Sequence, residues 1–196
     1  GYLTQAVCKF LDEAEGTDYL KELRNAGNYL NELLSEKADS QIFIKAKNIA
    51  QEINKKTCVI YGGTALTELV ASRWKTQINE NAKSKAYVGS IPEVHHNEIL
   101  SWDADLKASK SDFVLVFLRD DSEHSQIKKR FDLTKKLLIE KVDILNIEPK
   151  ASESTLSKVM ELVLLGDLLS IALAEELNMV PEDIEAIENL KKLLEE

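Results

Sequence analysis

The sequence predicts an α/β fold with a mostly parallel sheet of about four to five strands, flanked by helices on both faces. Short apolar runs alternate with segments of helical periodicity between residues 56 and 150, which is the pattern of an α/β core. The run at 112–118 is apolar at every position after the first, as expected of a central strand buried on both faces. Helical periodicity also precedes and follows this core, so extra N- and C-terminal helices are expected.

Residues 1–55 are expected to form a helical lead-in. A first run with helical spacing ends near Gly16, and a second covers residues 18–35, where Gly27 predicts a bend or interruption. Ser40 is placed to cap a third helix.

The predicted α/β core covers residues 56–150. Its first strand, at 57–61, runs into Gly62-Gly63-Thr64, where a helix begins. This turn lacks the glycine patterns of nucleotide-binding loops, so a tight turn with a threonine cap is expected. The other core elements are a helix from about residue 64 to 83, strands at 86–89, 112–118 and 142–147, and a helix at 123–140.

Residues 151–196 are expected to form C-terminal helices. A long helix is predicted at 155–177 with a mild interruption at Gly166, and Pro181 is placed to open the last helix. The sequence contains no internal repeat and no linker rich in Pro, Gly or Ser. Residues 1–196 are therefore predicted to be a single domain.

Composition narrows the classes of function. The sequence has 25 Lys and Arg residues and 34 Asp and Glu residues. The resulting net charge of −9 argues against nucleic acid or an anionic membrane as the main partner. Cys8 and Cys58 make no disulfide framework and no apolar run reaches transmembrane length, so we expect a cytoplasmic protein. The chain begins at Gly1 without an initiator Met or a signal peptide, which predicts a fragment or a processed chain.

The helix at 64–83 carries an unusual set of polar side chains. At 100° per residue, Arg73, Gln77 and Glu80 lie on the side that continues the apolar line through Leu69. We therefore expect them to point inward, where burial of charge is costly without a partner and where function should be sought. From spacing alone, an ion pair of Glu80 with Arg73 or Lys83 that only holds the helix end together is the more common explanation.

Two dense motifs in this region carry a family resemblance. Arg73-Trp-Lys-Thr-Gln-Ile-Asn-Glu-Asn-Ala-Lys83, followed by Pro92-Glu-Val-His-His-Asn-Glu98, resembles the C-terminal half of the bifunctional phosphoglucose/phosphomannose isomerases. Ile187-Glu-Asn-Leu-Lys191 resembles the closing helix of that family. The resemblance covers most of this chain but only about the second half of the enzyme that it implies.

The resemblance implies roles for particular residues. Glu80 matches the family's base, which moves a proton between C2 and C1 of the sugar through a cis-enediol. His96 matches the histidine that opens the sugar ring, and the family places it in the partner's site across a dimer interface. Lys191 matches a lysine that reaches the substrate, while Arg73 and Gln77 are expected to assist substrate binding.

The resemblance also implies a setting for this chemistry. It predicts a three-layer sandwich of the sugar isomerase (SIS) type in a homodimer that converts glucose 6-phosphate or mannose 6-phosphate to fructose 6-phosphate. Such an enzyme of glycolysis and gluconeogenesis needs no metal or organic cofactor. The family's N-terminal SIS domain, whose Ser/Thr-rich loop binds the sugar phosphate, has no counterpart here, so the chain alone is expected to have little activity.

Other interpretations stay open at this stage. His95 and His96 could be a hydrogen-bonded pair near a loop, and with Glu93 and Glu98 they could bind a metal, although their spacing matches no standard zinc pattern. Lys192 leaves the register of the C-terminal lysine uncertain by one residue. A non-catalytic SIS-like module that binds a sugar phosphate or a partner chain is the alternative from a different class.

Overall fold

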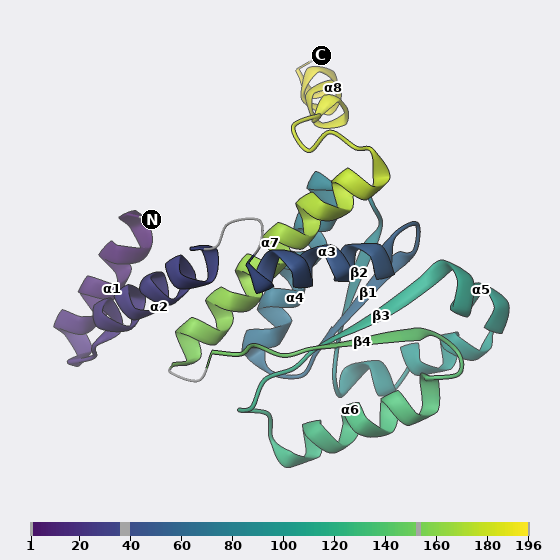
Figure 1. Cartoon of the computed structure of the whole chain (residues 1–196), viewed down its shortest axis with the longest axis horizontal. Helices are drawn as coiled ribbons and strands as arrows, with labels where there is room; N and C mark the ends of the chain where they lie inside the picture. The colour runs from purple at the N-terminus through teal and green to yellow at the C-terminus, as the bar shows by residue number, and fades with distance from the viewer. Residues whose placement is uncertain (1, 36–39, 152–153, 196) are drawn as a thin grey trace.

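The chain folds around one parallel sheet, as predicted. The computed structural model describes residues 2–35, 40–151 and 154–195. Its four strands pair in the order β2-β1-β3-β4, with every pair parallel, so their carboxyl ends share one edge of the sheet (Figure 1). The strands are β1 Thr57–Gly62, β2 Ala86–Ser90, β3 Phe113–Leu118 and β4 Asp143–Ile147.

Helices cover both faces of this sheet. Alternate strand residues point to opposite faces, so Cys58 and Ile60 lie in one hydrophobic core while Val59 and Tyr61 lie in the other. The first core is closed by three helices, which are α3 Gln41–Ile53, α4 Ala65–Asn81 and α7 Thr155–Leu177. The second core is closed by α6 Ser125–Leu138 and by the short turns η2 Glu93–His95 and η3 Glu98–Asp103, next to which α5 Leu106–Asp112 lies.

Helix α4 buries a different side from the one that we expected. Its buried residues are Thr67, Val70, Ala71, Trp74 and Ile78. Arg73 and Glu80 are exposed, Gln77 is half-buried, and Leu69 is 70% exposed, so the prediction that these side chains point inward is wrong. The reason is that Trp74 centres the buried stripe, whereas Arg73, Glu80 and Leu69 share a side more than a quarter-turn away.

Three details of the helices also differ from expectation. Helix α2 Tyr19–Leu34 runs through Gly27 without interruption, and α7 runs through Gly166 in the same way. The last helix, α8 Glu185–Leu194, begins after Pro181 rather than at it. The reason is local: the Asp183 carboxylate accepts the N–H of Glu185, and residues 180–183 close a turn before the helix.

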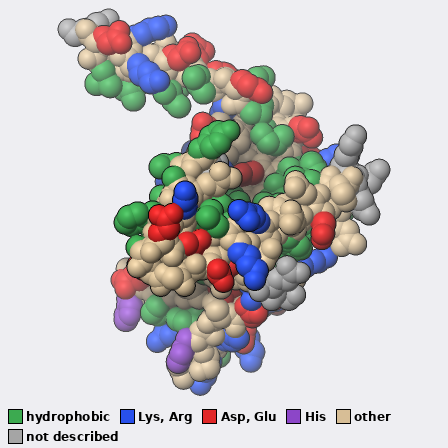
Figure 2. Space-filling model, turned by 90° about the vertical axis from the view of Figure 1, so that its left-hand side faces the viewer, with side chains coloured by type: hydrophobic (Ala, Val, Ile, Leu, Met, Phe, Trp, Pro, Cys, Tyr) green, Lys and Arg blue, Asp and Glu red, His purple; other side chains and the backbone are tan. Residues whose placement is uncertain are grey.

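Two elements extend away from the sheet. Helix α1 Tyr2–Glu15 pairs with α2 on one side of the molecule, and α8 projects from the far end of α7 (Figure 1). Neither α1 nor α8 buries a residue. Figure 2 shows a row of hydrophobic side chains along the projecting arm of α8, where Ile187, Leu190 and Leu193 are exposed. Within the described residues, none of the helices has the length and apolar character needed to cross a membrane.

Candidate functional site

Glu80 lies in the wall of a cleft between the end of α4 and the start of α8. The cleft has a volume of about 780 Å³. Within the described residues, the Glu80 carboxylate makes no hydrogen bond or ion pair, while its backbone carbonyl accepts from Lys83 Nζ at 2.6 Å. A carboxylate in such a cleft is free to accept a proton from a ligand. The lining residues are Thr76, Asn79, Glu80, Lys83, Asp183, Ile184, Glu185, Ala186, Ile187 and Asn189.

Arg73 and Gln77 belong to contacts that join α4 to α7. Arg73 binds the Asp167 carboxylate through Nε at 3.1 Å and Nη2 at 2.8 Å, and this hydrogen bond raises the pKa of Arg73. Gln77 Oε1 accepts from Asn81 Nδ2 at 3.3 Å, and the same amide donates to Ser170 at 2.8 Å. The ion pair that spacing suggested for Glu80 and Arg73 is therefore not formed, because Asp167 takes the guanidinium.

His96 is an exposed residue directly after η2, and His95 holds that turn in place. His95 Nε2 lies 2.7 Å from Thr134 Oγ1, and Nδ1 lies 3.1 Å from Arg130 Nη1, both on α6. Because a guanidinium can only donate, Nδ1 must accept, so the ring proton sits on Nε2 and is donated to Thr134. Desolvation, together with the charges of Arg130 and His96, lowers the pKa of His95. The hydrogen-bonded alternative that the sequence left open therefore describes His95.

One chain does not bring Glu80 and His96 together. Helix α4 runs back along the sheet and ends where β2 begins, at the amino edge, whereas His96 follows the carboxyl end of β2. Strand β2 alone separates these edges by about 13 Å at roughly 3.3 Å per residue. The two residues also lie on opposite faces, since α4 covers one core and the turn that carries His96 packs with α6 on the other.

Lys191 is an exposed residue in the last turn of α8. Lys192 is exposed beside it, and the cleft is lined by residues from the first turns of the same helix. The structure therefore places the C-terminal lysines on the helix that forms the second wall of the Glu80 cleft.

The four candidate metal ligands do not form a site together. Glu98 accepts the Tyr61 hydroxyl at 2.8 Å, and His95 is used by Thr134 and Arg130. Among residues 2–35, 40–151 and 154–195, no group of three or more His, Cys, Asp and Glu is arranged to hold a metal ion. The side chains of Glu93 and Glu98 thus give no support to the metal-dependent alternative.

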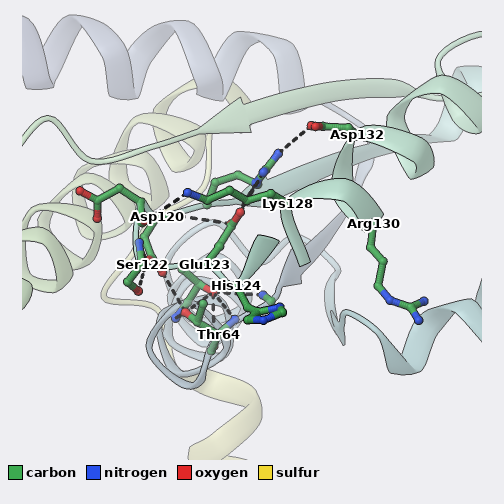
Figure 3. A network of polar contacts seen from close by, with 12 residues as sticks. Thr64, Asp120, Ser122, Glu123, His124, Lys128, Arg130 and Asp132 are labelled. Atoms are coloured by element: carbon green, nitrogen blue, oxygen red, sulfur yellow. Dashed lines mark hydrogen bonds and ion pairs between the residues drawn. The ribbon is translucent and has the colours of Figure 1, made fainter. Parts of the chain in front are cut away.

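The turn after β1 lies at the carboxyl edge of the sheet. Thr67 Oγ1 accepts the N–H groups of Gly63 at 3.1 Å and Thr64 at 3.0 Å, so these donors are not available to an anion. Thr64 Oγ1 donates to Asp120 at 2.8 Å (Figure 3). A Cβ atom at Gly62 would lie 2.7 Å from the backbone nitrogen of Glu68, so the turn requires glycine there. The threonine-capped turn is the arrangement that the sequence predicted.

Next to this turn lies a polar network that sequence reasoning missed. Arg119 binds Glu123 through Nε and Nη2 at 2.8–3.0 Å, reaches Asp132 at 3.4 Å, and lies 4.4 Å above the Phe131 ring. Glu123 and Asp132 are labelled in Figure 3. Desolvation opposes the charge of Arg119, but the hydrogen bonds and charges of Glu123 and Asp132 raise its pKa. The spacing of four residues between Arg119 and Glu123 was the only available signal. Since its charge is used internally, Arg119 offers little to a phosphate.

Comparisons with known proteins agree with the motifs. A family model for the bacterial phospho-glucose isomerase C-terminal SIS domain matches residues 44–194. The bifunctional phosphoglucose/phosphomannose isomerase of Aquifex aeolicus is 40% identical over 151 residues, which cover 76% of this chain and 46% of that protein. The protein of the same name from Caldicellulosiruptor bescii is 35% identical over 151 residues, which cover 77% and 44%. The chain thus spans about half the length of the curated relatives that it matches.

Solved structures share the fold. A glucose-6-phosphate isomerase-like protein from Thermus thermophilus superposes with a TM-score of 0.62 at 18% identity, covering 82% of this chain and 55% of that one. This similarity supports the fold alone, whereas the family match extends over most of the chain. The chain therefore belongs to the family of bacterial phosphoglucose isomerase C-terminal SIS domains.

Proposed function

We propose that this chain carries the proton-transferring half of an aldose–ketose isomerase that acts on hexose 6-phosphates. The substrates would be glucose 6-phosphate and mannose 6-phosphate, both converted to fructose 6-phosphate. The observation that carries the proposal is the Glu80 carboxylate, which lies in the wall of the cleft without a partner in the described part of the chain. The names of the relatives support the reaction class.

In this mechanism Glu80 removes the proton from C2 of the open-chain sugar and returns it to C1 of the cis-enediol. A carboxylate can serve as acceptor and then as donor, so no metal or organic cofactor is required. His96 moves a proton to or from the ring oxygen, a role that histidine side chains commonly take in catalysis. Lys191 would orient the sugar. Arg73 and Gln77, which bind Asp167 and Asn81, would assist indirectly by holding α4 against α7.

The separation of Glu80 from His96 supports a homodimer. The two residues lie at opposite edges and on opposite faces of one sheet, so one active site needs Glu80 from one chain and His96 from another. We propose that residues 1–196 form one SIS domain of a cytoplasmic protein and that a separate domain binds the phosphate. The chain alone would then have little activity, because the energy of phosphate binding contributes to the reaction.

The first test is fructose 6-phosphate formation from each sugar phosphate, in the whole protein that contains this chain and in the 196 residues alone. Glu80→Gln should lower kcat by about 10²- to 10⁴-fold in a folded protein. Glu52→Gln, at an exposed glutamate on α3, should leave kcat unchanged. Full activity in Glu80→Gln would exclude this residue as the base. Inactivity of the whole wild-type protein would favour a sugar-phosphate-binding module instead.

The shared site has its own test by complementation. Glu80→Gln and His96→Asn should each be inactive as homodimers. In an equal mixture that exchanges subunits, half of the dimers are mixed and one of their two sites is intact, so activity should return to about a quarter of wild type. If His96 served the site of its own chain, each site in the mixture would lack one group, and no activity would return.

A further inference from the structure

Lys83 occupies a backbone conformation that lysine seldom adopts. It follows the last turn of α4 with a φ of 53°, and the next residue, Ser84, donates its backbone N–H to the carbonyl of Ile78 at 3.4 Å. Helices that end in this left-handed conformation usually have glycine there, and sometimes asparagine. A residue with a longer side chain is strained at such a position, which directs attention to what that side chain does.

The Lys83 ammonium group joins two segments that are distant in the sequence. Nζ donates to the Glu80 carbonyl at 2.6 Å and to the Pro181 carbonyl at 3.1 Å. The first bond holds the ammonium group against the end of α4 that carries the proposed base. The second bond reaches the connection between α7 and α8. Lys83 also lines the cleft between these segments.

Helix α8 depends on that connection for its position. None of its residues is buried, so no packed side chain fixes the helix against the rest of the chain. The connection begins at Asn178, which ends α7 with a φ of 55°, and closes with a turn at residues 180–183. A bond to Pro181 acts at the middle of this short segment, where it limits the directions in which α8 can point.

We propose that Lys83 is a positioning residue that holds α8 across the cleft from Glu80. The inference rests on the proposed function. Lys83 would keep α8, which forms the second wall of the cleft and carries Lys191, at a fixed distance from the proposed base Glu80. Lys83 itself takes no part in proton transfer. Glycine would relieve the backbone strain at this position but could not supply the tether.

The position of α8 can be measured directly. Spin labels can be attached to cysteines introduced at Ser72 of α4 and Lys192 of α8, in a variant in which Cys8 is replaced so that it is not labelled. The distance between the two labels, measured by pulsed electron paramagnetic resonance, should have a narrow distribution. Lys83→Asn removes the tether but suits the left-handed backbone, so it should broaden the distribution without lowering the melting temperature. Lys85→Asn, at an exposed lysine two residues away, is the matched control and should leave the distribution narrow.

Activity separates positioning from stability. In the whole protein, Lys83→Asn should lower kcat roughly tenfold or more at an unchanged melting temperature, and Lys83→Arg should recover part of this loss. An unchanged distance distribution in Lys83→Asn, or a broadened one with full kcat, would overturn the inference. If the wild-type protein is inactive, the proposed function fails, and the distance measurement still decides whether Lys83 holds α8.

Discussion

Gly166 in the middle of α7 should be intolerant of even one added methyl group. The helix crosses α4 at this point, where the fully buried ring of Trp74 lies against the glycine. A Cβ atom at Gly166 would lie 2.2 Å from Trp74 Nε1 and 2.3 Å from Cδ1. The indole has no free direction in which to move, because Nε1 donates to the Leu162 carbonyl at 2.7 Å.

The size of the effect of Gly166→Ala follows from three contributions. Overpacking a well-filled core costs about 1–3 kcal/mol. Displacing Trp74 from Leu162 leaves a buried N–H without an acceptor, which costs about 1–3 kcal/mol more. Alanine in place of glycine returns about 1 kcal/mol of helix propensity. The free energy of unfolding should therefore fall by about 3 kcal/mol, a drop in melting temperature of roughly 6–12 °C for a chain of this size.

Gly27 supplies the matched control. It also lies inside an α-helix, but it is exposed and a Cβ atom there would have no neighbour within 4 Å. Gly27→Ala should raise the free energy of unfolding by up to about 1 kcal/mol through helix propensity. Urea unfolding followed by circular dichroism measures both variants. If Gly166→Ala proves as stable as Gly27→Ala, the close contact between α4 and α7 is not as described.

Two further predictions concern the other core. Arg119→Met should lower the free energy of unfolding by about 3–5 kcal/mol, because the Glu123 carboxylate would stay buried without its partner. Urea unfolding measures this loss, and the double variant Arg119→Met/Glu123→Leu should regain most of the lost stability. An equal loss in the double variant would contradict this. The surroundings of His95 in the folded chain lower its pKa from 6.5, so on acidification the unfolded chain binds a proton at His95 more readily than the folded chain does. The stability that depends on His95 is full above this value and is lost on acidification, so melting temperatures between about pH 7.5 and pH 5 should fall more in wild type than in His95→Asn. Parallel curves would show that His95 does not titrate differently on folding.

The strands could be predicted because their sequence signal is local. Runs such as 113–118 are apolar on both faces and end in polar turns, a pattern that is typical of a central strand in a parallel sheet. The buried side of α4 could not be predicted in the same way. Its core contacts come from Val70, Ala71, Trp74 and Ile78, while Leu69 is exposed, so the leucine that was used to locate the inward side marked the wrong side.

Contacts between residues that are far apart in the sequence could not be predicted from local sequence patterns. Arg73 and Asp167 are 94 positions apart, and periodicity does not say which helices pack against each other. The buried Glu161 carboxylate is a similar case, since it accepts the N–H groups of Lys150 and Ala151 as well as the hydroxyl of Tyr29. For the candidate site, motif resemblance supplied the residues, but only the topology showed that its members lie at opposite edges of the sheet.

That topology also places the candidate site at an uncommon edge. In open parallel sheets, ligands usually bind beyond the carboxyl ends of the strands. Here that edge carries the Thr64–Asp120 contact and the Arg119–Glu123 pair, beside a cleft of about 290 Å³ that Lys128 and Lys158 also line. Glu80 lies near the amino edge, beside the start of β2. Under the proposed function, a substrate would therefore approach Glu80 from the amino edge of this sheet.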